Sequence, residues 1–219
     1  MKSLRIKPLL FAALAAFAAL PAFAADLSPQ VAAVRDRWAE VKYDLPAEKR
    51  DAAFEALAKQ AEAVRAAAPR DAGVLIWEGI VLSSWAGEKG GLGALGLVKK
   101  ARKDFETALA VEPTALDGSA YTSLGSLYYQ VPGWPVGFGD DDKAREMLAK
   151  GLALNPDGID ANYFQADFLR EQEDWAGAEK ALLKALAAPA RPGRERADAG
   201  RRAEAQAMLK RVREELASR

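Results

Sequence analysis

One short pattern recurs along the second half of the chain and constrains its fold more than any other feature. Each copy has a small residue, a large apolar residue four positions later, another small residue three positions after that, and then a proline. The copies are Ala101, Phe105, Ala108 and Pro113; Ala144, Leu148, Gly151 and Pro156; and Ala178, Leu182, Ala185 and Pro189. Spacings of three and four residues place such side chains on one face of a helix, which proline then ends. The pattern therefore predicts a series of similar helices.

A second predicted helix precedes each copy, and it carries a small residue in the middle of its apolar stripe. These small residues are Gly79, Gly125 and Ala166. A small side chain at a helix crossing lets two backbones approach closely, while larger neighbours fill the space around it. Because no alternating strand pattern occurs elsewhere, we expect an all-α chain of packed helix pairs.

These helix pairs resemble the tetratricopeptide repeat (TPR), whose unit is an antiparallel pair of helices of 34 residues. The residues that match the signature of the family are Tyr121, Leu124, Gly125, Tyr128, Ala144, Leu148, Gly151 and Pro156. Trp175, before Ala178, matches the aromatic residue that closes the turn inside a unit. The units at 75–113 and 121–156 are longer than the family pattern, by about ten and about seven residues between their two helices.

The resemblance implies an antiparallel helix-pair solenoid, with two loop insertions and a C-terminal capping helix. We expect a signal peptide over residues 1–24 and a single helical domain over 25–219. Within the domain the expected units are a degenerate capping repeat at 28–69, TPR-like repeats at 71–113, 117–156 and 158–189, and a final helix at 194–218. Arg201 and Arg202 in that final helix either belong to the polar face of a capping helix or bind an acidic partner.

The first residues have the features of an export signal. Three basic residues among the first seven precede the apolar run Leu9–Leu20, and Ala22-Phe23-Ala24 has the small-x-small pattern that signal peptidase reads. We expect cleavage after Ala24, a periplasmic location and no membrane insertion after cleavage; an uncleaved anchor is the alternative. The chain has no cysteine, so we expect no lipid-anchored cysteine.

The composition excludes several classes of chemistry. With neither cysteine nor histidine, the chain has no disulfides, no Cys/His nucleophile, no histidine-based triad and none of the commonest metal ligands. Beyond the signal there are 28 basic and 31 acidic residues, a balance that argues against a nucleic-acid partner. We expect no cofactor and no enzyme activity; a carboxylate-based enzyme is the weaker alternative, with Asp160 and Asp167 as the acids to test.

Two segments between helices contain unusual numbers of glycines. Gly90–Gly96 contains G-x-G-x-x-G at positions 91, 93 and 96, but a dinucleotide site needs a preceding strand, so we predict a flexible loop between helices. Val131–Gly139 combines glycines and prolines with Trp134 and Phe138. Large apolar side chains are costly to leave in water. They are expected either to pack on the helices or to form a lid over a binding cavity, with both insertions at the same edge of the solenoid.

Three consecutive acids, Asp140–Asp142, follow the second of these segments. They lack the alternating ligands and the distal glutamate of a calcium loop. Acidic residues at the start of a helix cap its free N–H groups and interact favourably with its dipole. We therefore predict a helix cap and no metal site.

Polar and aromatic side chains form a row beside the apolar stripe of each first helix. If the apolar stripe faces the partner helix, this second row lies on the concave face of the solenoid, where it forms either a pocket with polar anchors or an ordinary solvated groove. Its members are Ser83, Thr122, Ser126, Tyr129, Tyr163, Asp167 and Arg170. Together with Trp134 and Phe138 they are the predicted ligand- or partner-binding residues.

A narrower resemblance rests on the export signal and on the segment Gly-Trp-Pro-x-Gly-Phe-Gly-Asp at 133–140. These features are similar to periplasmic TPR proteins related to the T component of TRAP-type solute transporters, although many of those are lipoproteins and this chain lacks the cysteine. The resemblance implies a non-catalytic interaction protein whose partner is a periplasmic solute-binding protein. The alternative is direct binding of a small ligand in a cavity beneath the two glycine-containing segments. Assembly into a homo-oligomer is compatible with either function.

Overall fold

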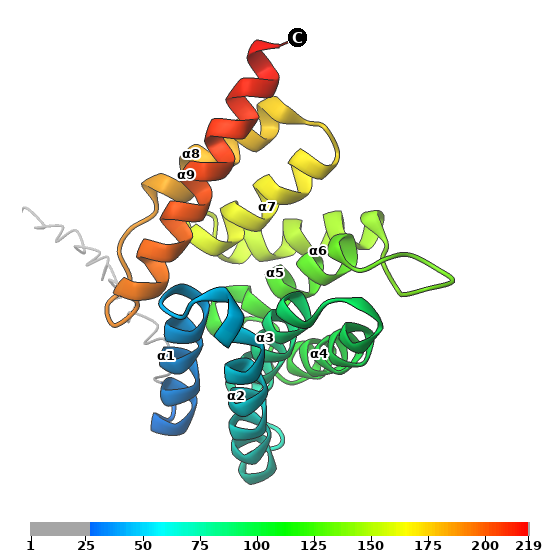
Figure 1. Ribbon diagram of the computed structural model, residues 1–219, viewed down its shortest axis with the longest axis vertical. Coiled ribbons are helices and arrows are strands. Elements are labelled where there is room, and N and C mark those ends of the chain that lie inside the picture. The colour runs from blue at the N-terminus through cyan, green and yellow to red at the C-terminus, as the bar shows by residue number, and fades with distance from the viewer. Residues whose placement is uncertain (1–26, 219) are drawn as a thin grey trace, which may run out of the picture.

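The computed structural model describes residues 27–218, so the predicted signal peptide lies outside the described residues (Figure 1). Those residues form nine helices and no strand. The helices are α1 (Pro29–Tyr43), α2 (Ala47–Ala67), α3 (Ala72–Lys89), α4 (Gly91–Val111), α5 (Ala115–Gln130), α6 (Asp141–Leu154), α7 (Ile159–Glu171), α8 (Trp175–Ala187) and α9 (Glu195–Ala217). None of them is long and apolar enough to cross a membrane.

Consecutive helices pack as pairs, and the pairs stack side by side. The most extensive contacts join α3 to α4, α5 to α6 and α7 to α8, and the first helices of these pairs also contact one another. Helices α1 and α2 form a further pair, and α9 covers α8 (Figure 1). The predicted all-α fold of stacked helix pairs with a C-terminal covering helix is confirmed.

Side-chain caps fix where several of the helices begin. Ser28 Oγ accepts a hydrogen bond from the N–H of Val31 at the start of α1, and Asp71 does the same at α3. Asp140 accepts from the N–H of Lys143 at 3.1 Å, and Asp141 and Asp142 lie in the first turn of α6. Asp140 thus satisfies an N–H group that has no partner inside the helix, and Asp141 and Asp142 add negative charge at its positive end.

Glycines hold the helices of each pair close together. A Cβ atom added to Gly79 in α3 would lie 2.5 Å from Cε1 of Phe105 in α4, and one added to Gly125 in α5 would lie 2.8 Å from Cγ of Leu148 in α6. Both partner side chains are almost fully buried. The small residues that the sequence places mid-stripe therefore mark the helix crossings.

The prediction of a flexible loop over Gly90–Gly96 is wrong, because α4 begins at Gly91. Only Gly90 separates α3 from α4, and its φ of 62° lies in the left-handed region that glycine adopts easily. Ala94, Leu97 and Val98 have helical spacing and pack against the core, which offsets the helix-breaking tendency of the neighbouring glycines. The extra residues of this unit lengthen α3 and α4 instead of forming a loop.

A cluster of charged residues is buried where α2, α3 and α4 meet. The side chains of Glu78 and Asp104 are fully buried, and Nη1 of Arg65 lies 3.0 Å from Glu78 and 2.6 Å from Asp104. Lys100 pairs with Glu78 at 2.6 Å, while Oδ2 of Asp104 has no hydrogen-bond partner among the described residues. Burial and the charge of Glu78 raise the pKa of Asp104 to about 6.

The last helix returns to the first one. Figure 1 shows the beginning of α9 beside the end of α1. Arg196 of α9 pairs with Asp44 at 2.8 Å, and the hydroxyl of Tyr43 donates to Glu204 at 3.4 Å. An open solenoid would leave its concave face exposed, whereas here α9 bridges the two ends of the stack along one side.

Candidate binding cavity

A cavity of about 500 Å³ lies on the concave side of the helix stack. Its walls come mainly from α1, α3, α5 and α7, from the segment before α9 and from the first turns of α9, with Phe105 of α4 and Asn155 after α6. The volume falls within the range of about 300–1,000 Å³ that is usual for small-molecule sites. Because α9 contacts α1, the contact between the last and first helices is part of what forms this cavity.

The structure brings five of the predicted concave-face residues to the cavity wall. These are Ser83, Thr122, Ser126, Tyr163 and Asp167. They come from α3, α5 and α7, which occupy equivalent places in successive helix pairs. The repeat spacing thus predicted which faces of these helices look inward.

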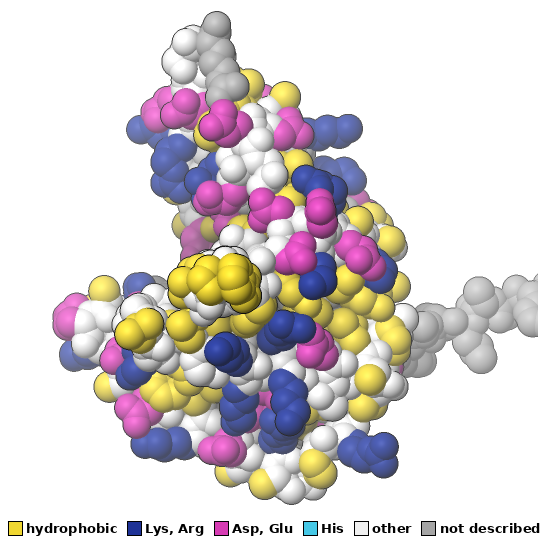
Figure 2. Space-filling model, turned by 90° about the vertical axis from the view of Figure 1, so that its right-hand side faces the viewer, with side chains coloured by type: hydrophobic (Ala, Val, Ile, Leu, Met, Phe, Trp, Pro, Cys, Tyr) yellow, Lys and Arg dark blue, Asp and Glu magenta, His cyan; other side chains and the backbone are white. Residues whose placement is uncertain are grey.

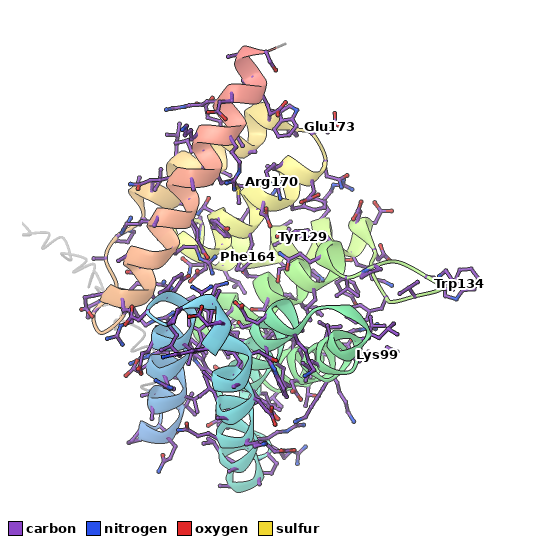
Figure 3. The ribbon with its side chains drawn as sticks, in the orientation of Figure 1. Lys99, Tyr129, Trp134, Phe164, Arg170 and Glu173 are labelled. Carbon is purple, nitrogen blue, oxygen red and sulfur yellow. The ribbon has the colours of Figure 1, made fainter. Side chains whose placement is uncertain are left out.

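The other two members of the predicted row, Tyr129 and Arg170, bind Asp167 and do not line the cavity themselves. The hydroxyl of Tyr129 donates to Oδ2 of Asp167 at 2.8 Å, and Nη2 of Arg170 donates to Oδ1 at 2.8 Å (Figure 3). Burial, together with the negative charge of Asp167, raises the pKa of the Tyr129 hydroxyl well above its usual value. The Tyr129 hydroxyl is therefore a hydrogen-bond donor, and both oxygens of Asp167 are engaged.

Asp160, the other candidate catalytic acid, is held between two arginines. Its oxygens accept from Nη1 of Arg191 and from Nε of Arg201, both at 2.8 Å. Burial acts to raise the pKa of Asp160, but the charges of Arg201 and Arg191 outweigh it and hold the pKa well below its ordinary value. A carboxylate in this state is a poor proton donor or acceptor near neutral pH, so its role is to order the two arginines.

Three arginines in and just before α9 form one end of the cavity, and sequence reasoning missed their position. Arg191, Arg194 and Arg201 all line it. Arg201 is 7% exposed and its guanidinium lies 4.3 Å from the ring centre of Tyr163 and 4.8 Å from that of Phe164. The basic bias of the C-terminal segment is visible in the sequence, but its proximity to α7 is a tertiary contact.

Two tryptophans form an apolar wall beside these arginines, and they too were missed. Trp38 of α1 and Trp77 of α3 meet edge to face, with ring centres 5.9 Å apart. The indole N–H of Trp38 donates to Ser84 at 2.8 Å. Trp77 is 4% exposed, and its N–H has no acceptor among the described residues. Both rings share helical faces with other core residues, so their pattern alone predicts only packing.

The segment Val131–Gly139 is a true loop, but it does not cover the cavity. Trp134 at its tip is 90% exposed and points away from the helices (Figure 3). Phe138 is partly buried, edge to face with Tyr128 at 5.9 Å and 5.0 Å from the guanidinium of Arg102. Of the two predicted roles, packing therefore applies to Phe138 alone.

The cavity does not lie beneath the two glycine-containing segments, since no residue of 90–96 or 131–139 lines it. That part of the small-ligand prediction needs correction: the loop at 131–139 projects from the outer edge, where Figure 2 shows hydrophobic side chains standing out from the surface. The physical reason is that α4 is continuous from Gly91, which removes one of the two expected loops from that edge.

Comparison with known proteins finds structural neighbours but no matching family. No protein-family model and no curated protein matches the chain. Among solved structures, the crystal structure of MamA is similar to 78% of this chain and 94% of its own length, with 20% sequence identity and a TM-score of 0.45. Similarity at this level does not transfer function. The helix pairs and the cavity that they enclose are the features that support a binding role.

Proposed function

We propose that this chain is a non-catalytic binding protein of the TPR type that mediates protein–protein interaction. The observation that supports the proposal is the concave cavity, to which equivalent faces of α3, α5 and α7 contribute polar and aromatic side chains. Concave surfaces of helix-pair solenoids are extended binding surfaces. The two acids considered for catalysis are both held by cationic or hydroxyl partners, which fits binding better than proton transfer.

The proposed location is the periplasm, and the proposed partner is the solute-binding component of a TRAP-type transporter. The apolar run and Ala22-Phe23-Ala24 near the N-terminus support export. The exposed loop tip at Trp134 supports docking of a protein, because an isolated indole in water gains free energy when a partner covers it. Trp and Tyr are also the residues that most often dominate interface energies.

Direct binding of a small ligand is the second candidate function, and the enclosure of the cavity favours it. The contact between α1 and α9 narrows access to the concave face. A volume of about 500 Å³ suits a small molecule or the end of a peptide better than a folded domain. The two functions are compatible if the outer loop binds the protein partner while the cavity holds its ligand.

The decisive experiment separates the two surfaces with two variants. Trp134→Ala removes the exposed indole, and Ser83→Phe places a ring into the cavity from α3. Binding of the purified solute-binding component to the mature protein is followed by isothermal titration calorimetry, and retained small molecules by native mass spectrometry. We expect Trp134→Ala to weaken binding of the partner and Ser83→Phe to reduce ligand retention.

Arg37→Ala is the control, because Arg37 pairs with Glu40 on its own helix and does not line the cavity. A mature protein that binds neither the solute-binding component nor any small molecule contradicts the proposal. Wild-type binding of the solute-binding component and of small molecules by the double variant Trp134→Ala/Ser83→Phe also contradicts it.

A further inference from the structure

Arg194 is the one arginine of the cavity end whose guanidinium has no hydrogen-bond acceptor among the described residues. Arg191 donates to Asp160 and Asp198, and Arg201 donates to Asp160 and Glu204. Arg194 is also partly buried and lines the cavity. A guanidinium has five N–H donors, and removing them from water without acceptors is costly.

The position of Arg194 is fixed by the turn before α9. Gly193 has a φ of 71°, and the N–H of Arg194 donates to the carbonyl of Arg191 at 3.0 Å. The carbonyl of Arg194 then accepts the first hydrogen bond of α9, from Asp198. The guanidinium lies over the ring of Trp77 at 5.4 Å from its centre. Backbone and ring together hold the charge at the cavity wall before anything binds there.

The acids near Arg194 are already bound by its neighbours, because Asp160 accepts from Arg191 and Arg201, and Asp198 accepts from Arg191. The charges that act on Arg194 include those of Arg191 and Arg35 as well as those of Asp160 and Asp198. Burial and the charge of Arg191 lower the pKa of Arg194, so its surroundings disfavour its positive charge. A negatively charged ligand group would supply the hydrogen-bond acceptors that the guanidinium of Arg194 lacks.

The neighbouring wall is apolar and includes a second donor without an acceptor. Trp77 is 4% exposed and its indole N–H is unpartnered, although buried N–H groups normally have partners. Trp38 packs against Trp77, and Phe164 of α7 lines the same cavity. Figure 3 shows Phe164 on the side of α7 that faces the middle of the molecule. An apolar group would be covered by aromatic rings on entering.

We propose that the cavity binds a small organic monocarboxylate, whose carboxylate accepts hydrogen bonds from the guanidinium of Arg194 and whose apolar body lies against Trp77, Trp38 and Phe164. The planar fork of arginine matches the two oxygens of a carboxylate. Phosphate also fits that fork, but it has no apolar body to lie against the aromatic rings of the neighbouring wall. The proposal depends on the second proposed function, ligand binding in the cavity.

The test titrates the full mature protein with phenylacetate, indole-3-acetate and octanoate in a calorimeter, beside phenylacetamide and inorganic phosphate. We expect at least one of the three carboxylates to bind, and phenylacetamide and phosphate to bind more weakly than it. Arg194→Gln should weaken its binding by at least about tenfold, the usual effect of losing hydrogen bonds to a charged group. Arg194→Lys should restore only part of the loss because it lacks the fork.

Arg211→Gln is the control, since it removes an exposed arginine of α9 that does not line the cavity. Unfolding by far-ultraviolet circular dichroism checks that each variant is folded. Equal binding by Arg194→Gln overturns the inference, as does tighter binding of phosphate or the amide, or no binding of any carboxylate up to its solubility limit. The docking proposal is tested separately, because its solute-binding partner is titrated against Trp134→Ala.

Discussion

The close approach of α3 and α4 at Gly79 provides a quantitative test of the fold. In Gly79→Ala the new methyl would lie 2.5 Å from Cε1 and 2.7 Å from Cζ of Phe105, whose ring is fully buried. Contacts this short force the ring or the helix to move, and inserting a methyl group into a packed core costs about 1–3 kcal/mol. Alanine is also the better helix former, by about 1 kcal/mol. The net expected effect is destabilisation by up to about 2 kcal/mol.

Gly87→Ala is a matched control on the same helix. A Cβ atom at Gly87 meets nothing within 4 Å, so only the gain in helix propensity remains. We expect this variant to be more stable than the wild type by about 0.5–1 kcal/mol. The two substitutions are chemically identical, so the difference of about 1–3 kcal/mol between them measures the packing at the helix crossing.

Urea unfolding of the mature protein, followed by far-ultraviolet circular dichroism, gives the free energies of unfolding. In a chain of this size, each kcal/mol moves the thermal midpoint by about 2–4 °C, so melting curves provide an independent check. The double variant Gly79→Ala/Phe105→Leu should lose less stability than the sum of the two single variants, because they relieve one shared contact. If Gly79→Ala is as stable as Gly87→Ala, the close packing of α3 on α4 is refuted.

Three further predictions concern the loop, the buried acid and the cavity. Trp134→Ala should change the free energy of unfolding by less than about 0.5 kcal/mol, since the side chain is 90% exposed, whereas Phe138→Ala should cost about 1–2 kcal/mol; equal effects in urea unfolding would contradict this. The folded state raises the pKa of Asp104 from 3.8 to about 6, so it binds more protons than the unfolded state in this range. The contribution of Asp104 to the free energy of unfolding should therefore fall by about 2–3 kcal/mol as pH rises from about 4 to about 6, because the raised pKa favours the folded state only while the group is protonated. Unfolding curves of Asp104→Asn should lack that decline. Arg201→Met should destabilise the protein by about 3 kcal/mol, because it leaves Asp160 and Glu204 without one of their cationic partners in a partly buried site; a melting temperature like that of the wild type would count against this role.

Local patterns identified the helices and their inward faces well. The spacing of Ala101, Phe105 and Ala108, and of its counterparts in the later units, repeats with the period of a helix and reports burial directly. Gly79 and Gly125 marked the crossings, because glycine inside an apolar stripe has few other reasons to occur. Asp140 as a cap was also readable, since capping depends on neighbours three residues away.

Predictions from local composition were wrong where tertiary packing favoured a different conformation. The glycines of 90–96 favoured a loop by propensity, but Leu97 and Val98 gain more by burial than the glycines lose. The exposed position of Trp134 was equally invisible, because its neighbours in sequence do not say whether a loop folds back or projects. In both cases the outcome depends on surfaces contributed by other helices.

The sequence by itself determined the all-α class, the pairing of helices and the polar row that three of them share. Only the tertiary structure decided that α9 returns to α1 and closes the concave face into a cavity. It alone brought Arg194 over Trp77, residues more than a hundred positions apart. The physical reason is range: helix periodicity and capping are set by residues three or four apart, whereas the cavity depends on contacts between the two ends of the chain.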